Sequence, residues 1–297
     1  MRCRLLSTIA ALAVVAAGSN ASAAILLSDT FADGDRTNTN LPTESAVYAS
    51  APAAVTMANG SLSYAQSTGS RRLHTYFTPA TPVTLGVGDR LLATVDFIPK
   101  GALYDATSRN FRFGLFSDPT GARVTVDSAG DAGTGNTWED AQGYSVFMPL
   151  SAGPTTTQQF QINKRVTTTG NLMGSGANHV AAPSGGGELT FSLDTLYTLT
   201  LEVHKVSATQ SDVTIQLLNG ATVLASQTVS DNGTDLGAGA PYDNFDMMAF
   251  RFSAASATAD VLEFRRLQVE LIPIPEPTSC GLALFSALAL AAARRRA

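Results

Sequence analysis

Cysteine is almost absent from this chain of 297 residues, which holds only two. Cys3 lies near the N-terminus and Cys280 near the C-terminus, so the long segment between them has no thiol. A disulfide scaffold, thiol catalysis and cysteine-ligated zinc are therefore excluded for that segment. Its stability must come from burial and backbone pairing, which a domain of roughly 250 residues can supply without covalent cross-links.

Charged residues are also scarce, at 14% of the chain. Little charge combined with abundant Gly, Ser, Thr and Ala is typical of extracellular or periplasmic β proteins. Five of the 19 basic residues are arginines close to the two ends, and without them 14 basic residues face 24 acidic ones, a net charge of −10. Such a charge repels phosphate backbones, so we expect no nucleic-acid partner, whereas divalent cations and neutral glycans stay open.

The usual catalytic motifs are missing. No Gly-x-Ser-x-Gly, phosphate-loop or dinucleotide-binding pattern occurs. Glycoside hydrolases need two suitably spaced carboxylates, but the nearest pair, Glu139 and Asp140, is adjacent and would point to opposite faces of a strand. His74, His179 and His204 have no metal-ligand spacing, and we expect each to be a surface or half-buried residue. We therefore expect the protein not to be an enzyme.

The N-terminus has the layout of a secretory signal peptide. Arg2 and Arg4 precede an apolar stretch from Leu5 to Ala17, and Ala21 and Ala23 supply small side chains for a signal peptidase. We expect cleavage after Ala23, which makes residues 1–23 the signal peptide. An uncleaved membrane helix is the alternative, but the apolar run is short.

The body, residues 24–272, consists of short β-rich runs separated by Gly, Asn, Asp, Pro and Ser clusters. Among these runs are AILLSDTF, SLSYAQ, RLHTYF, RLLATVDFI, NFRFGLF, YSVFMPL, QFQINKRV, LYTLTLEVHKV, DVTIQLL, ATVLASQTV, FDMMAFRF and VLEFRRLQVEL. In LYTLTLEVHKV, apolar residues alternate with polar ones, which is typical of a strand buried on one face. Asn219-Gly220 separates two runs and predicts a tight hairpin with a type I′ turn.

No stretch of the body has a convincing amphipathic helical period, so the strands predict a single all-β domain, an antiparallel β-sandwich or barrel. The succession YTLTLEV, VTIQLLNGATVLAS, FDMMAFRF and VLEFRRLQVEL, with the opening DTFADGDRTNTNLP, resembles the laminin-G or concanavalin A-like jelly roll. That resemblance implies an antiparallel jelly-roll sandwich. Proteins of that fold commonly bind glycans and some cut them, so the fold does not decide between the two.

The C-terminal segment, residues 273–297, carries three features in order. These are Pro275-Glu276-Pro277, an apolar run to Ala293, and the cluster Arg294, Arg295 and Arg296. From Ser279 to Ala293 the run is 15 residues, about 22 Å as a helix against a hydrocarbon core of about 30 Å. A transmembrane helix of this length is a poor permanent anchor but suits transient insertion, with the arginines on the cytoplasmic side.

This arrangement resembles the PEP-CTERM sorting signal of Gram-negative bacteria. The resemblance implies processing by an exosortase, a membrane-embedded enzyme thought to cut near the motif, and it covers about the last 25 residues. An ordinary C-terminal membrane anchor is the alternative. The opening DTFADGDRTNTNLP also looks like the start of other exoproteins with this signal.

Two groups of residues are candidate binding sites. Asp29, Asp33 and Asp35 offer hard oxygen ligands around Gly34 and predict a structural calcium, which jelly-roll domains often hold. Asp-Gly-Asp is also an ordinary turn sequence, and that interpretation stays open.

The second candidate site surrounds the single tryptophan. Trp138 lies in a polar loop with Asn136, Glu139, Asp140 and Tyr144. Flat rings stack on the apolar side of a sugar, while amides and carboxylates bind its hydroxyls, so this group predicts a glycan platform. The alternative is that Trp138 closes the edge of the sandwich.

Together these features predict a secreted or surface protein of the cell envelope or extracellular matrix. We expect a non-catalytic structural or glycan-binding component whose partners are signal peptidase, an exosortase-like enzyme and an extracellular polysaccharide. A carbohydrate-active enzyme, lyase or hydrolase, on the same fold is the main alternative. A protein-adhesion module, which would need an exposed apolar patch, is another.

Overall fold

The computed structural model describes residues 22–66, 70–104, 108–118, 121, 123–127, 140–155, 159–174, 178–252 and 259–274. Its compact unit runs from Ala23 to Pro273. The apolar part of the signal peptide lies outside the described residues, and so do the sorting-motif residues Pro275, Glu276, Pro277, Arg294, Arg295 and Arg296. Over the described ranges, no helix is long and apolar enough to cross a membrane.

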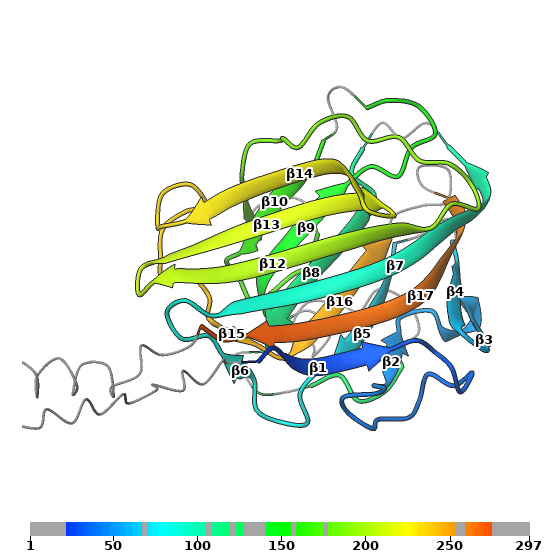
Figure 1. Cartoon of the computed structure of the whole chain (residues 1–297), viewed down its shortest axis with the longest axis horizontal. Coiled ribbons are helices and arrows are strands. Elements are labelled where there is room, and N and C mark those ends of the chain that lie inside the picture. Colours follow the sequence, from blue (N-terminus) through cyan, green and yellow to red (C-terminus); the bar gives the residue numbers. More distant parts are fainter. Residues whose placement is uncertain are drawn as a thin grey trace, which may run out of the picture. The chain divides into compact units, whose positions relative to one another are not determined.

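One layer of the compact unit is an eight-stranded sheet (Figure 1). Its strands are β1 (Ala24–Asp29), β3 (Val55–Ala58), β4 (Ser61–Ala65), β7 (Arg90–Leu103), β12 (Tyr197–Ser207), β13 (Gln210–Asn219), β14 (Thr222–Asp231) and β17 (Ala259–Ile272). They lie in the order β14-β13-β12-β7-β17-β4-β3, and β1 pairs with the remaining length of β17.

The second layer is a seven-stranded sheet in the order β11-β10-β9-β8-β16-β5-β2. Its strands are β2 (Val47–Ala49), β5 (Arg71–Tyr76), β8 (Phe111–Ser117), β9 (Gln142–Met148), β10 (Gln161–Arg165), β11 (His179–Ala181) and β16 (Met247–Phe252). The pair β6 (Val83–Thr84) and β15 (Asn244–Phe245) and a 3-10 turn η1 (Pro52–Ala54) complete the elements. All strand pairs in the two layers are antiparallel, which confirms the predicted all-β antiparallel sandwich.

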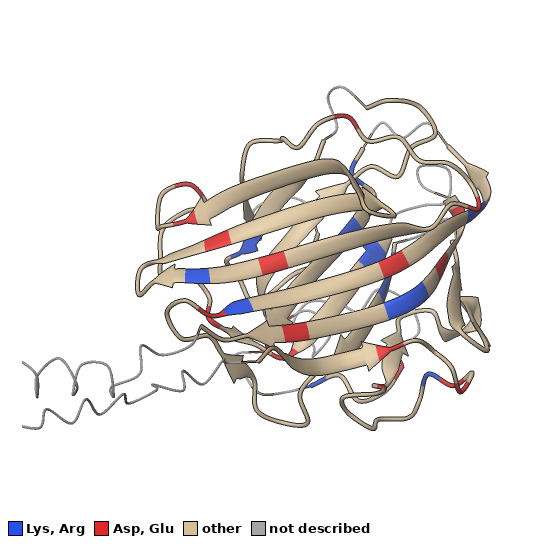
Figure 2. Cartoon of the chain, in the orientation of Figure 1, with Lys and Arg blue, Asp and Glu red and all other residues tan. Residues whose placement is uncertain are grey.

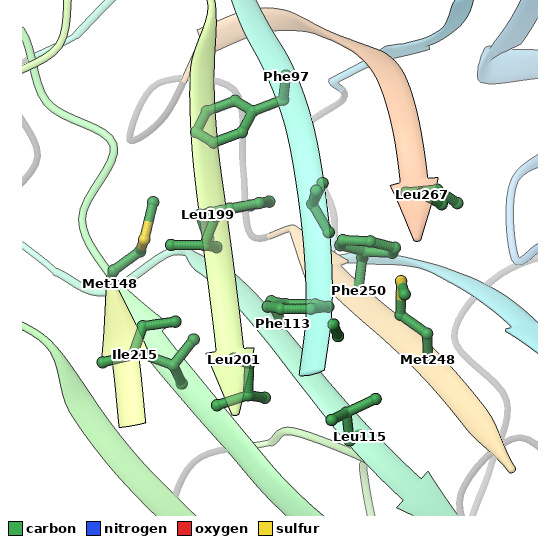
Figure 3. Packing of buried hydrophobic residues seen from close by; sticks show 14 of the residues in the cluster. Phe97, Phe113, Leu115, Met148, Leu199, Leu201, Ile215, Met248, Phe250 and Leu267 are labelled. Carbon is green, nitrogen blue, oxygen red and sulfur yellow. The ribbon is translucent and has the colours of Figure 1, made fainter. Parts of the chain in front are cut away.

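The hydrophobic core fills the space between the two sheets (Figure 3). On β12, Leu199, Leu201 and Val203 are fully buried, as their alternation with polar residues predicts. They contribute to one cluster with inward-facing residues of the other sheet, among them Phe113 and Phe250. Full burial of each large apolar side chain contributes about 1.5–3 kcal/mol, so this two-sided core is the main stabilising term.

The hairpin between β13 and β14 forms as predicted, but its turn is shifted by one residue. Asn219 pairs with Thr222, so Gly220 and Ala221 form the two-residue loop. Gly220 has a φ of +57°, whereas Asn219 is not among the residues with positive φ. A single glycine at the first loop position fits a type II′ turn, so the prediction of a type I′ turn at Asn219-Gly220 is wrong.

Candidate functional site

A hollow of about 390 Å³ opens at one end of the sandwich, within the size range of small-molecule sites. Its lining is mostly polar, with one carboxylate, and includes one aromatic ring and two prolines. The lining residues are Pro82, Ser117, Gln142, Ala240, Pro241, Tyr242, Asp243 and Asn244. We call this hollow the end pocket.

Ser117 and Gln142 form one wall of the end pocket. They face each other across β8 and β9 as the last pair of that ladder. Both side chains point to the same side of their strands as the buried core residues. They lie just beyond the end of the core, so polar side chains stand at the rim of the apolar interior. Within the described part of the chain neither side chain makes a hydrogen bond, so both can bind a ligand without first breaking an internal contact.

The opposite wall is the segment 240–244, which is held firmly. The backbone N–H of Tyr242 donates to Tyr144 Oη at 2.8 Å, and Tyr242 Oη donates to the Arg165 carbonyl at 2.5 Å. Asn244 Oδ1 accepts from the Thr84 hydroxyl at 2.6 Å. These contacts fix both the ring of Tyr242 and the amide of Asn244 before any ligand arrives.

A buried polar network lies beneath this wall. Tyr144 Oη donates to Asp231 Oδ2 at 2.5 Å, and Lys164 Nζ donates to the Ala240 carbonyl at 2.9 Å. Burial, and next the nearby Asp231 charge, raise the pKa of Tyr144, and burial likewise raises the pKa of Tyr242. Both phenols therefore stay protonated and keep their roles as hydrogen-bond donors.

One carboxylate, Asp243, lies among the described residues that line the end pocket. Its Oδ1 accepts from the Asn244 amide at 2.7 Å, and its Oδ2 lies 3.5 Å from Lys205 Nζ. Glycoside hydrolysis typically uses two carboxyl groups, one as acid and the other as base or nucleophile. The pocket therefore offers donors and acceptors for hydroxyl groups and a ring for stacking, without that catalytic pair.

Of the predicted glycan platform, the structure describes only Asp140 and Tyr144. Asn136, Trp138 and Glu139 lie outside the described residues. Asp140 is described and lies two residues before Gln142. Tyr144 is fully buried, so its ring is not a surface on which a sugar can stack; its hydroxyl instead supports Tyr242.

Four residues of the end pocket were not predicted from the sequence: Ser117, Gln142, Tyr242 and Asn244. The run Pro241-Tyr242-Asp243-Asn244 ends a glycine-rich stretch that reads as a plain loop. An aromatic residue between proline, aspartate and asparagine in a loop was the available signal, since binding residues concentrate on loops held by a rigid scaffold. Ser117 and Gln142 gave no local signal, because their role depends on strand register.

The three residues that were predicted to bind calcium make different contacts in the structure. Asp29 is buried, and its Oδ1 accepts from the Phe31 N–H at 2.7 Å. Asp35 Oδ1 accepts from the Thr37 N–H at 2.8 Å and from the Thr37 hydroxyl at 2.8 Å, which lowers the pKa of Asp35. Asp33 shares a hollow with Asp29 and Glu44 instead.

Burial raises the pKa of Asp29, and burial followed by a hydrogen bond with Asp33 raises the pKa of Glu44. No group of three or more acidic, histidine or cysteine side chains within the described ranges could hold a metal ion. Calcium takes six to eight oxygens, so the residues present do not fit the predicted calcium site.

No protein-family model and no curated protein matches the chain. Among solved structures, the chain is similar to peanut lectin, at 14% identity over 84% of this chain and 98% of the lectin, with a TM-score of 0.45. It is also similar to the exoplasmic/lumenal domain of VIP36 in a Ca²⁺/Man2-bound form, at 9% identity over 85% and 89% of the two chains, with a TM-score of 0.45. A third is an endo-1,3-β-glucanase from Streptomyces sioyaensis, at 12% identity over 84% and 97%, with a TM-score of 0.42. At TM-scores below 0.5, no ligand or activity is transferred from these proteins to this chain.

Proposed function

We propose that this protein is an exported, non-catalytic glycan-binding component of the cell envelope or extracellular polymer matrix, and that it holds a sugar in the end pocket. The observation that carries the proposal is the pair Ser117 and Gln142. Their side chains have no hydrogen-bond partner within the described residues and lie in one hollow with the ring of Tyr242. A ring face with nearby amide and hydroxyl groups matches the two-sided chemistry of a sugar.

The state of the carboxylate in the end pocket favours binding of a sugar without its cleavage. Asp243 is already engaged by Asn244 and Lys205, so it is poorly placed to act as a free acid or base. A lyase or hydrolase would need further titratable groups that reach the same sugar. Calcium has no role in this proposal, because over the described ranges no acidic group near Asp29 could hold a metal ion.

Export is the second part of the proposal, and it rests on the two ends of the sequence. Residues 1–23 are proposed to be removed by signal peptidase. Residues 273–297 are proposed to insert transiently in the membrane and to be processed by an exosortase-like enzyme, as the resemblance to the PEP-CTERM signal implies. A β-sandwich without thiols between its ends suits an oxidising compartment.

A glycan array probed with the exported protein tests the binding proposal. We expect a set of sugars to bind, and Gln142→Ala and Ser117→Ala each to weaken binding about 3- to 10-fold, the loss of one or two neutral hydrogen bonds. The matched control is Gln216→Ala on the outer face of β13, which should bind like the wild type. EDTA should not change binding.

An array on which no sugar binds would overturn the proposal. Binding that Trp138→Ala abolishes and Gln142→Ala leaves intact would move the site to the loop around Trp138. Loss of binding in the Gln216→Ala control would also contradict the placement in the end pocket.

A further inference from the structure

Arginines gather on the outer face of the seven-stranded sheet, away from the core. Arg72 on β5, Arg251 on β16 and Arg112 on β8 occupy one row across three neighbouring strands. Two strands further along, Arg165 on β10 stands opposite His179 on β11. Neighbouring strands lie about 4.8 Å apart, so the row places several guanidinium groups close together.

The segment 167–174, which we call the strap, contacts three arginines of this cluster, Arg112, Arg251 and Arg165. Arg112 and Arg251 both donate to the Met173 carbonyl, at 2.5 and 3.2 Å. Arg165 donates to the carbonyls of residues 169–171 at 3.1, 2.9 and 2.7 Å. Met173 itself has a φ of +54°, a conformation that non-glycine residues rarely adopt. Two cations thus converge on one neutral oxygen of a strained residue.

The charge on this face is poorly compensated at Arg112. Within the described residues Arg112 forms no ion pair; it lies over the ring of Phe147, 4.3 Å from its centroid. Burial, and then the charge of Arg251, lower the pKa of Arg112 to about 9. Burial, and then Arg165, Arg112 and Arg251, lower the pKa of His179 to about 3, and neither of its ring nitrogens has a hydrogen-bond partner in the described ranges.

The outer face of the eight-stranded sheet is different. There Asp96 Oδ2 lies 2.9 Å from Arg266 Nε, and Glu202 lies 3.6 Å from Arg90. Figure 2 shows acidic and basic residues interspersed along these strands. On that face acidic and basic side chains pair with each other, whereas on the other sheet Arg112 and Arg251 both donate to the Met173 carbonyl of the strap.

We propose that Arg112, Arg251 and Arg165 form an anion cradle for the carboxylate of an acidic sugar, a uronate unit of an extracellular polysaccharide. The carboxylate replaces the Met173 carbonyl between Arg112 and Arg251. Hydrogen bonds from a guanidinium to an ionised oxygen are roughly twice as strong as those to a neutral one, and the planar fork of arginine matches a carboxylate. Arg112 is only partly buried, which gives a ligand a point of entry.

This inference rests on the proposed glycan binding and adds the acidic class of polymer. Calorimetric titration of the exported protein with oligogalacturonate, its carboxyl-reduced form and sodium sulfate tests it. We expect the oligogalacturonate to bind and the carboxyl-reduced oligomer to bind at least 10-fold more weakly. Sulfate should compete only at high concentration, which separates a polymer-borne carboxylate from a free small anion. Hydrogen exchange of residues 169–173 should become faster in the complex.

Arg112→Gln should lower the affinity for oligogalacturonate at least 10-fold, and Arg90→Gln on the opposite face is the matched control. If the reduced and native oligomers bind equally, the cradle is overturned while the end pocket stands. If oligogalacturonate binds equally well to Arg112→Gln and to the wild type, the placement on this face is overturned. If Gln142→Ala changes nothing while Arg112→Gln abolishes uronate binding, the cradle stands and the end pocket falls.

Discussion

Nζ of Lys164 lies 2.8 Å from Oδ2 of Asp231, and both side chains are almost completely buried, at 2% and 0% exposure. Lys164 belongs to β10 in one sheet, and Asp231 ends β14 in the other. The ion pair therefore joins the two layers of the sandwich beneath the end pocket. Tyr144 adds a third member through its hydrogen bond to Asp231.

Asp231→Asn should destabilise the protein by about 3 kcal/mol. The substitution leaves the Lys164 ammonium buried with neutral partners, and breaking a buried pair from one side typically costs about 3–5 kcal/mol. Urea unfolding followed by fluorescence or circular dichroism measures the change. The double variant Lys164→Met/Asp231→Leu should cost less than the two single changes together, because neither charge is then left alone.

The control for this pair is the exposed pair Arg90–Glu202, whose atoms lie 3.6 Å apart. Glu202→Gln should change the free energy of unfolding by less than about 1 kcal/mol, as for most surface ion pairs. Equal losses of unfolding free energy in Asp231→Asn and Glu202→Gln would show that the buried pair stabilises the protein no more than the exposed pair does.

Stability should fall as the pH drops from 6.5 towards 5.5. The pKa of His179 is lowered to about 3 and that of His74 well below its usual value, mainly by burial. In this window the unfolded chain binds protons that the folded chain does not, so each histidine removes up to about 1.4 kcal/mol per pH unit. Burial raises the pKa values of Asp29 and Asp246, and these two groups contribute to the pH dependence in the opposite direction.

The measurement is the urea midpoint at pH 7.0, 6.5, 6.0 and 5.5 for the wild type and for His179→Phe. The variant should show a shallower dependence on pH, since phenylalanine preserves a ring against Phe147 and takes up no proton. Gln216→Ala, on the outer face of β13, removes no titratable group; it is the control and should keep the wild-type slope. An unchanged slope in His179→Phe would refute the assignment.

Much of the fold follows from local patterns in the sequence. The strict alternation in β12 and β7 determines which residues face the core, because a one-residue slip would expose every buried side chain. The short strands β2, β6 and β11 were not predicted, since two or three residues carry no measurable period. β2 and β11 pair with the longer strands β5 and β10, whereas β6 pairs with β15, which is also two residues long.

The end pocket could not be predicted in the same way. Gln142 and Ser117 are ordinary polar residues until the β8–β9 register sets them opposite each other. Tyr242 joins them from about 100 positions further along the chain, a contact that no local pattern specifies. Tyr144 resembled an exposed platform residue because the sequence showed its polar neighbours but not the buried Asp231 that binds its hydroxyl.

Gly143→Ala should destabilise the seven-stranded sheet by about 3 kcal/mol, the upper range for forcing atoms into a packed interior. A Cβ at this position would lie 2.1 Å from the Leu115 carbonyl and 2.7 Å from Phe116 Cα, and neither is a flexible side-chain end. Thermal and urea unfolding measure the loss. Ser145→Ala is the control two residues along β9. Its buried hydroxyl has no hydrogen-bond partner among the residues that the structure describes, so its removal should be close to neutral. A neutral Gly143→Ala would contradict this close approach of the strands.

The C-terminal tail yields a prediction about processing. If residues 273–297 act as a sorting signal, Glu276→Gln or deletion of residues 294–296 should leave unprocessed protein in the membrane fraction. The first change removes the charge between the two prolines, and the second removes the cationic cluster that holds the C-terminus on the cytoplasmic side. Glu270→Gln, a glutamate of β17 outside the tail, is the matched control and should be released normally. The measurement is the intact mass of the released and the membrane-bound protein. Normal release of both tail variants would contradict the sorting assignment. A released wild-type protein that still carries Ala297 would exclude cleavage of the tail.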